Sequence, residues 1–261
     1  MNNTAPPPPH DARPLVHIAG LPFDVVDTAG AVSRLCQAMR DRRRLFLSTP
    51  NLNFLMTAQR DPAFKESVLR SDMSVADGMP IVWLARHQGT PLPERVAGAS
   101  VFEALRRGDG QAVLQRPVRV FFFGGPTGVA DKACSVLNVE HAAGGPMQCV
   151  GALCPGFGSV ADMSTLQCCN RSMPVGRIFC GSPGRSQGQA WIMHNLAQLQ
   201  VPVVSHLGAV VNFVAGQVGR APLWMQRLGL EWLWRIKEEP TLFKRYRRDG
   251  WGFLGLWWRN I

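Results

Sequence analysis

The chain has 261 residues, of which 46% are hydrophobic, so it can bury a full core and a wholly disordered protein is excluded. Its formal net charge of +10 indicates an anionic partner, such as nucleic acid, an acidic membrane surface or a phosphorylated substrate. Because no run of about 18 apolar residues occurs, the sequence predicts no membrane-spanning helix. The length suits one α/β domain, with or without an appendage.

Residues 1–14 include four consecutive prolines, Pro6 to Pro9, and lack the apolar segment of a secretory signal. We therefore expect a disordered tail and a cytoplasmic protein. Seven cysteines are present, but no pair has C-x-x-C spacing and no histidine lies at zinc-ligand distance. The sequence predicts thiols rather than disulfides, and no metal site.

Strand and helix patterns alternate along residues 15–216. In chain order we expect a strand or hairpin at 16–26, a helix at 28–40 with Thr28 as N-cap, a strand at 44–48, a helix capped by Asn51, a helix at 62–69, a strand at 73–76, a helix at 79–86, a strand at 118–123 and a helix at 129–137. This alternation predicts a Rossmann-like α/β core, in which helices flank both faces of a mainly parallel sheet.

The composition changes at residue 217. Residues 217–261 hold six of the eight tryptophans, and nine Arg or Lys residues against four Asp or Glu. The pattern predicts a helical, membrane-associating appendage that begins with one helix over 220–240 and whose cations meet anionic lipid. We expect three tryptophans mostly to pack on the core and three mostly to face lipid: Trp224, Trp232 and Trp234 in the first set, Trp251, Trp257 and Trp258 in the second.

Two predicted strands stop abruptly in small polar residues, at Thr49-Pro50-Asn51 and at Asp77-Gly78. Open α/β folds place their ligand sites at this rim of the sheet. A threonine and an asparagine there can orient a hydroxyl group while the Asp77 carboxylate takes its proton. Each motif taken alone is more often simple turn chemistry.

A glycine-rich loop follows the strand at 118–123. Its first residues, Gly124 and Gly125, lie between a strand and a helix, which is an arrangement that presents backbone N–H groups to a phosphate. The loop therefore suggests a nucleotide diphosphate site. It matches neither G-x-G-x-x-G nor a P-loop, so an ordinary strand-to-helix turn is the alternative.

Together these motifs resemble glycosyltransferase family 26. The resemblance covers roughly 45–140 and 200–248 and rests on Thr49-Pro50-Asn51, Asp77-Gly78, Val96-Ala97-Gly98, segment 123–129, segments 214–216 and 220–222, and segment 230–240. The family includes teichoic-acid N-acetylmannosaminyltransferases, the transferase of enterobacterial common antigen and the β-1,4-glucosyltransferase of xanthan assembly. The chain looks most similar to the xanthan type.

The resemblance implies an inverting transferase that moves a sugar from a UDP-sugar to a saccharide on an undecaprenyl diphosphate carrier. For the xanthan type, the sugar is glucose and the product is an exopolysaccharide. Such an enzyme is peripheral to the cytoplasmic face of the bacterial inner membrane. The resemblance leaves the oligomeric state open, a homo-oligomer included.

The resemblance also assigns residue roles. It implies that Asp77 is the general base, that Thr49 and Asn51 position the substrate, and that two appendage arginines, Arg235 and Arg245, reach the diphosphates. Two further cations, Lys244 and Arg247, are candidates to compensate for Leu242, which stands where the family often has arginine. Because the chain has no Asp-x-Asp motif, we expect arginines rather than a metal or other cofactor to neutralise the departing UDP.

The resemblance fails between about 143 and 190. The family's Pro-Lys-Gln-Glu quartet is absent in register, so either Gln187 or Gln189 would replace its glutamine. Residues 174–180 are poor strand material, which predicts a weakened central strand. A local shift of reading frame is one hypothesis for this pattern.

Two alternatives stay open. The chain could be a catalytically silent relative that binds UDP or lipid without turnover, or a basic nucleic-acid-binding protein. The second explains the charge but not the tryptophans, and no nucleic-acid-binding motif occurs, so we expect no nucleic-acid partner. His206, near a predicted strand end, could meet a substrate, although a structural histidine is the more common case at such a position.

Overall fold

The computed structural model describes residues 13–154, 177–182 and 185–259. Six strands form one sheet in the order β4-β3-β8-β7-β5-β6, and each neighbouring pair is parallel. They are β3 (Leu45–Ser48), β4 (Met73–Ser74), β5 (Val118–Gly124), β6 (Met147–Leu153), β7 (Arg177–Ser182) and β8 (Val203–Ser205). A separate antiparallel hairpin joins β1 (Leu15–Ile18) to β2 (Leu21–Asp24).

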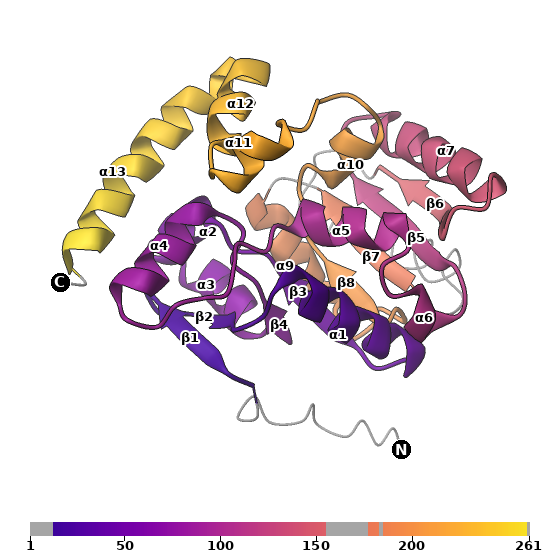
Figure 1. Ribbon diagram of the computed structural model, residues 1–261, viewed down its shortest axis with the longest axis horizontal. Coiled ribbons are helices and arrows are strands. Elements are labelled where there is room, and N and C mark those ends of the chain that lie inside the picture. Colours follow the sequence, from indigo (N-terminus) through magenta and orange to yellow (C-terminus); the bar gives the residue numbers. More distant parts are fainter. Residues whose placement is uncertain (1–12, 155–176, 183–184, 260–261) are drawn as a thin grey trace.

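Helices connect the strands and cover the sheet (Figure 1). In the core they are α1 (Thr28–Arg40), α2 (Leu52–Ala58), α3 (Pro62–Leu69), α4 (Met79–His87), α5 (Gly98–Arg107), α6 (Gln111–Leu114), α7 (Val129–Ala142), α9 (Arg185–Asn195) and α10 (Val210–Val214). The appendage contains α11 (Leu223–Arg227), α12 (Glu231–Glu238), a 3₁₀ turn η2 (Pro240–Leu242) and α13 (Phe243–Arg259). The predicted α/β fold, with a parallel sheet and flanking helices, is confirmed, and the segment that follows it is mainly helical.

Side chains of β5 alternate between the two faces of the sheet, as the strand geometry requires. Val120 and Phe122 join a large hydrophobic cluster with α1, α5 and α7. Phe121 and Phe123 join a smaller cluster on the other face, which includes Trp191 of α9. Helices therefore cover both faces, as the sequence predicted.

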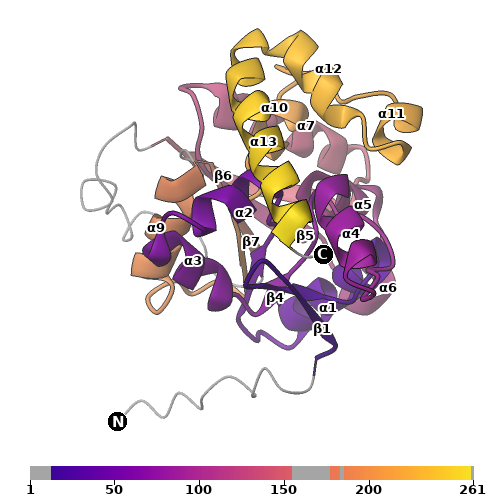
Figure 2. The ribbon, with the colours of Figure 1, turned by 90° about the vertical axis from the view of Figure 1, so that its left-hand side faces the viewer.

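A third hydrophobic cluster lies beside the sheet and holds the appendage. It combines the β1–β2 hairpin with α2, α3 and α4, and it also contains Leu256 of α13. Figure 2 shows α13 running across this side of the molecule. Burial of apolar side chains from α13 in this cluster stabilises the contact between appendage and core.

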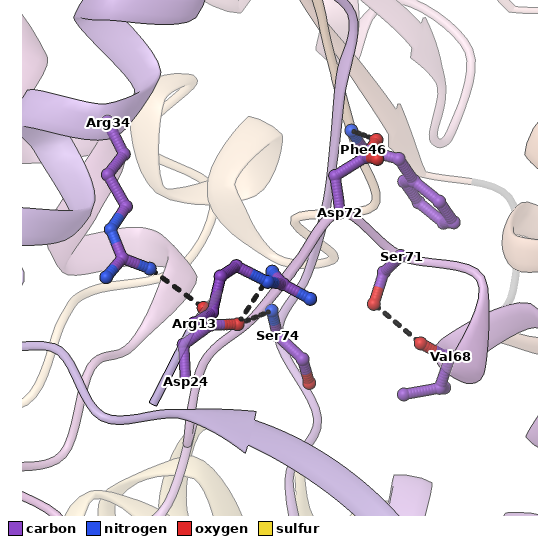
Figure 3. Close-up of polar contacts among 8 residues, drawn as sticks. All are labelled: Arg13, Asp24, Arg34, Phe46, Val68, Ser71, Asp72 and Ser74. Atoms are coloured by element: carbon purple, nitrogen blue, oxygen red, sulfur yellow. Dashed lines mark hydrogen bonds and ion pairs between the residues drawn. The ribbon is translucent and has the colours of Figure 1, made fainter. Parts of the chain in front are cut away.

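A buried carboxylate fixes the hairpin to the sheet edge (Figure 3). Asp24, at the end of β2, accepts hydrogen bonds from Arg13 at 3.1 Å and Arg34 at 2.8 Å, and from the backbone N–H of Ser74 at 2.9 Å. Two cations and a backbone donor offset the cost of burying this charge. The network holds β4, whose end leads to Asp77, in a fixed position.

Several helix boundaries differ from the prediction. The N-cap of α1 is Asp27, whose side chain accepts a hydrogen bond from the Gly30 N–H at 2.7 Å, so Thr28 is the first helical residue. The single helix expected over 220–240 is wrong, because the chain breaks between α11 and α12. Gly229 adopts a φ of 73° there, which lies outside the helical region. A Cβ at this position would lie 2.2 Å from the Met79 side chain, so close packing on α4 also requires glycine.

Two expectations about residues 134–180 are also wrong. β7 pairs in parallel with both β5 and β8, although its sequence is poor strand material, because neighbours on both sides satisfy its backbone. Cys134 of α7 and Cys149 of β6 form a disulfide rather than two thiols, since α7 packs on β6 and brings their Cα atoms to 5.0 Å. Residues 155–176 and 183–184, and most of the predicted tail, lie outside the described residues.

The tryptophans do not divide as predicted. Trp224 is 58% exposed and Trp232 is also exposed, so neither packs mostly on the core. Trp257 packs on the core instead of facing outward, because its ring stacks on His87 of α4 at a centroid distance of 4.3 Å. Trp251 and Trp258 are exposed, and their contact with lipid stays a prediction.

Candidate active site

A cavity of about 900 Å³ lies between the rim of the sheet and the appendage. Its floor comes from residues that follow three parallel strands: Thr49 and Asn51 after β3, Asp77 after β4, and His206 after β8. Its roof comes from α12 and α13 of the appendage. The two polar motifs that the sequence singled out therefore meet in one site.

Asn51 serves both as a turn residue and as part of the cavity lining. Its side-chain oxygen accepts a hydrogen bond from the Phe54 N–H at 3.2 Å and caps α2. The Asp77 N–H donates to the Pro50 carbonyl at 2.9 Å, which ties the two rims together. The turn-chemistry alternative and the site prediction thus describe the same residues.

Asp77 places a carboxyl group at the floor of the cavity. The pKa of its carboxyl group is raised from 3.8 to about 6, mainly by burial and also by the nearby Glu231 carboxylate. Arg95, Arg235 and a hydrogen bond from the Gly98 N–H oppose this rise. At neutral pH the group is ionised, and its basicity is higher than that of an exposed aspartate, which suits proton abstraction from an alcohol.

Three arginines of the appendage line the cavity: Arg235 of α12, and Arg245 and Arg247 of α13. Arg235 lies 5.9 Å from the Phe213 ring centroid and 3.6 Å from Glu239. The Nε atoms of Arg235 and Arg245 are buried and have no hydrogen-bond partner among the described residues. Such guanidinium groups can hydrogen-bond phosphate oxygens of a ligand.

An ion pair connects the floor to the roof. Arg95, between α4 and α5, contacts Glu231 of α12 at 2.7 Å, and both side chains are largely buried. Because both charges lie close enough to shift the pKa of Asp77, the docked position of α12 affects the base directly. The sequence analysis missed this pair, since neither residue belongs to a chemical motif that marks a site.

The model of the glycosyl transferase WecG/TagA/CpsF family matches residues 16–261. The chain belongs to this family. It is therefore a glycosyltransferase, and the resemblance to glycosyltransferase family 26 is confirmed. Two relatives, from Bacillus subtilis (strain 168) and Bacillus spizizenii, are both named N-acetylglucosaminyldiphosphoundecaprenol N-acetyl-beta-D-mannosaminyltransferase.

The identities to these relatives are modest but extend over most of each chain. The first is 26% identical over 200 residues, which is 76% of this chain and 73% of the relative. The second is 24% identical over 233 residues, which is 85% of this chain and 84% of the relative. The matched region of the family model includes the appendage, so the roof of the cavity is part of the family architecture.

Some predicted site residues do not line the cavity of this family member. Gly124 and Gly125 lie at the end of β5, and Lys244 is on α13, but none of the three is among the lining residues. Gln189 is buried below the rim, where its side-chain amide donates to Ser48 at 3.3 Å. The side chain of Gln187 lies outside the described residues.

Two more residues of the site were missed or misread. His206 lines the cavity and stacks on Phe54 at a centroid distance of 6.5 Å, so it is both structural and part of the site. Asp249 of α13 is only 2% exposed, lines the cavity and accepts a hydrogen bond from Asn53 of α2 at 2.8 Å. Its isolated position in a basic segment gave no signal in the sequence.

Among residues 13–154, 177–182 and 185–259, no group of three His, Cys, Asp or Glu side chains is placed to hold a metal ion. Over the same residues, no helix combines the length and the apolar composition needed to span a bilayer.

Proposed function

We propose that this glycosyltransferase moves a hexose from a UDP-sugar to a saccharide on an undecaprenyl diphosphate carrier, with inversion at the anomeric carbon. The observation that carries the proposal is the Asp77 carboxylate, with its raised pKa of about 6, in a cavity whose opposite wall holds three arginines. A base on one side and cations on the other match the two needs of the reaction.

The proposed reaction has a simple balance. Asp77 takes the proton of the acceptor hydroxyl, whose oxygen forms a bond to the anomeric carbon. The bond from that carbon to the UDP oxygen breaks, and its electron pair leaves with the diphosphate. Arg235, Arg245 and Arg247 offset the charge that develops on the leaving group.

We propose that these arginines make a divalent cation unnecessary. Their guanidinium groups lie in the same cavity as the base, and two of them have buried Nε atoms without a partner among the described residues. Transfer rates should therefore stay within about twofold when EDTA is added. Loss of transfer that Mg²⁺ or Mn²⁺ restores would contradict this part of the proposal.

The names of the two Bacillus relatives support an acceptor on a lipid diphosphate. The exposed tryptophans of α13, Trp251 and Trp258, support a peripheral position on an anionic membrane, which we place at its cytoplasmic face. For the donor we propose UDP-glucose, on the resemblance to the xanthan-type enzyme. Because the relatives are named mannosaminyltransferases, UDP-N-acetylmannosamine is the competing donor.

A transfer assay with purified full-length protein tests the proposal. It would supply a synthetic lipid-diphosphate saccharide and, in parallel, radiolabelled UDP-glucose, UDP-N-acetylmannosamine and other UDP-sugars. We expect transfer from UDP-glucose, and a loss of at least about 100-fold in kcat for Asp77→Asn. Asp109→Asn is the matched control, because Asp109 is exposed and does not line the cavity.

Three outcomes would change the conclusion. Transfer only from UDP-N-acetylmannosamine would overturn the donor assignment and keep the reaction. Near-normal turnover by Asp77→Asn would remove Asp77 as the base. Binding of UDP without transfer to any acceptor would favour the catalytically silent relative.

A further inference from the structure

The cavity is polar at one end and apolar at the other. Its polar part contains Asp77 with Arg245 and Arg247. Its apolar part contains Trp83 of α4 together with Trp251 and Leu254 of α13, all of which are also exposed on the molecular surface.

The charged and the apolar lining residues follow one another along two helices, α4 and α13, that run in the same direction. Trp83 meets Phe253 at a ring centroid distance of 6.4 Å, and His87 stacks on Trp257 at 4.3 Å. Residue numbers on the two helices increase together, so α4 and the second half of α13 run side by side in the same direction. Both ribbon views show this half of α13 beside α4 (Figure 1, Figure 2).

The polar ends of the two helices lie at the reaction site, and their apolar residues follow. Asp77 directly precedes α4, and Trp83 comes six residues after it. On α13, Leu254 comes seven residues after Arg247. At 1.5 Å per residue, the apolar walls therefore extend about 10 Å away from the charged groups along both helices.

We propose that the apolar part of the cavity, lined by Trp83 of α4 and by Trp251, Phe253 and Leu254 of α13, binds the first isoprene units of the acceptor's lipid chain. This inference rests on the proposed function, since it takes the acceptor to be a prenyl diphosphate saccharide. The saccharide diphosphate of the acceptor lies in the charged part of the cavity, and the chain leaves along the apolar walls toward the membrane. A ligand with an anionic centre and a hydrocarbon tail complements both ends of the cavity.

Trp83 distinguishes this subsite from general attachment to a bilayer. It is 39% exposed, it comes from the α/β core rather than from the basic appendage, and it lines the cavity. Trp258 offers the contrast, because it is 73% exposed on the same helix as Trp251 but does not line the cavity. Loss of Trp83 should affect recognition of the chain, whereas loss of Trp258 should affect only attachment to lipid.

The test compares two acceptors with the same saccharide diphosphate, one on a long prenyl chain and one on a single isoprene unit. Initial rates are measured in detergent solution with the full-length enzyme and the donor that supports turnover. We expect the wild type to prefer the long chain in kcat/KM by about tenfold or more, and Trp83→Ala to lower this preference about fivefold to tenfold. The KM for the UDP-sugar should not change in Trp83→Ala.

Matched variants complete the design. Leu254→Ala removes less volume from the same wall and should lower the preference by a smaller factor, while Trp83→Phe should largely restore it. Trp258→Ala should leave the preference unchanged but weaken sedimentation with acceptor-free anionic vesicles. An unchanged preference in active Trp83→Ala, or an equal loss in Trp258→Ala, would overturn the inference.

A photoreactive prenyl diphosphate gives a second measurement that does not need turnover. Irradiation should label peptides that contain residues 79–87 and 251–258, and the long-chain acceptor should compete for them. Labelling confined to other peptides would overturn the subsite. The absence of transfer to either acceptor by the wild type would instead count against the proposed function, whatever the labelling pattern.

Discussion

At the scale of single residues, the site depends on how its surroundings hold the Asp77 carboxyl group. Burial disfavours its charged form and raises its pKa to about 6, even though Arg95 and Arg235 act in the opposite direction. In the proposed reaction the charged form is the base, so transfer would require a protonation state that folding itself disfavours. The raised pKa of Asp77 predicts how transfer, stability and the Arg95–Glu231 ion pair respond to pH and to substitution.

The first prediction concerns the pH dependence of transfer. Because only the ionised carboxylate accepts a proton, kcat should rise with pH, reach half its maximum near pH 6 and level off about one pH unit above that. Initial rates from pH 4.5 to 8.5, at saturating substrates, would test this. A profile that stays flat from pH 5 to 8 would contradict the role of Asp77.

The second prediction concerns stability. The pKa in the folded state, about 6, lies above the ordinary value of 3.8, so the protonated group favours folding. This contribution is complete below about pH 3.8 and is lost as pH rises through 6. Asp77→Asn should therefore be more stable than the wild type at pH 8 and unfold at a higher temperature. The gain in the free energy of unfolding should be on the order of 1 to 2 kcal/mol, since partial exposure to the cavity reduces the effect of the pKa shift.

Thermal unfolding at pH 8 and pH 5 would measure this difference. The gain of Asp77→Asn should be smaller at pH 5, where the wild-type carboxyl group is mostly protonated in the folded state. A variant that is less stable than the wild type at pH 8 would show that Asp77 contributes to the fold through its hydrogen bond more than its burial costs.

The third prediction concerns the ion pair across the cavity. Glu231→Gln removes a negative charge that raises the pKa of Asp77 and leaves the charge of Arg95 in place. The acid limb of the rate profile should therefore move to lower pH, by about half a unit to one unit. Glu238→Gln on the same helix is the control, because Glu238 does not line the cavity. A shift to higher pH would contradict the assigned electrostatics.

At the scale of elements, the sequence predicted what depends on local pattern. The helix cap at Asn51, the helix that begins at Pro62 and the strand 118–123 all follow from neighbouring residues, and the structure confirms them. The break at Gly229 could not be predicted in this way. It depends on Met79, which is 150 residues away in the chain and leaves no room for a side chain.

The site also combines features that neighbouring residues determine with features that depend on contacts between distant parts of the chain. Thr49, Asn51 and Asp77 were found because they end strands, and Arg235 and Arg245 because of the family resemblance. Arg95, Glu231 and Asp249 were missed, since isolated charged residues acquire meaning only when the appendage packs on the core. The predicted division of the tryptophans was wrong for the same reason, because the exposure of each ring depends on how the appendage helices pack on the core.

Gly229 allows a test of how the position of the roof affects transfer. Gly229→Ala adds a Cβ that would overlap Met79 and also strains a residue with a φ of 73°. We expect the rate of transfer to fall about tenfold, while unfolding of the core changes little. Gly216→Ala is the control, because Gly216 also has a positive φ, of 67°, but its Cβ would meet nothing within 4 Å. Equal losses in both variants would assign the effect to backbone strain alone.

At the scale of the whole molecule, the core holds Asp77, and the appendage holds the arginines of the cavity and the exposed tryptophans. Deletion of the residues after 216 should therefore abolish transfer and release the protein from anionic vesicles. The far-UV circular dichroism of the α/β core should persist, because only a few side chains of α13, such as Leu256, join its hydrophobic clusters. Full activity of the truncated chain would refute the role of the roof.

The contact between Arg95 and Glu231 joins parts of the chain that are 136 residues apart, and the ribosome makes Arg95 first. Domains generally fold from their N-terminal side during synthesis, so the sheet can assemble while the arginines of α12 and α13 are still to be added. A nascent chain at that stage holds Asp77 without the guanidinium groups that face it. The complete cavity therefore forms only after the appendage has been made.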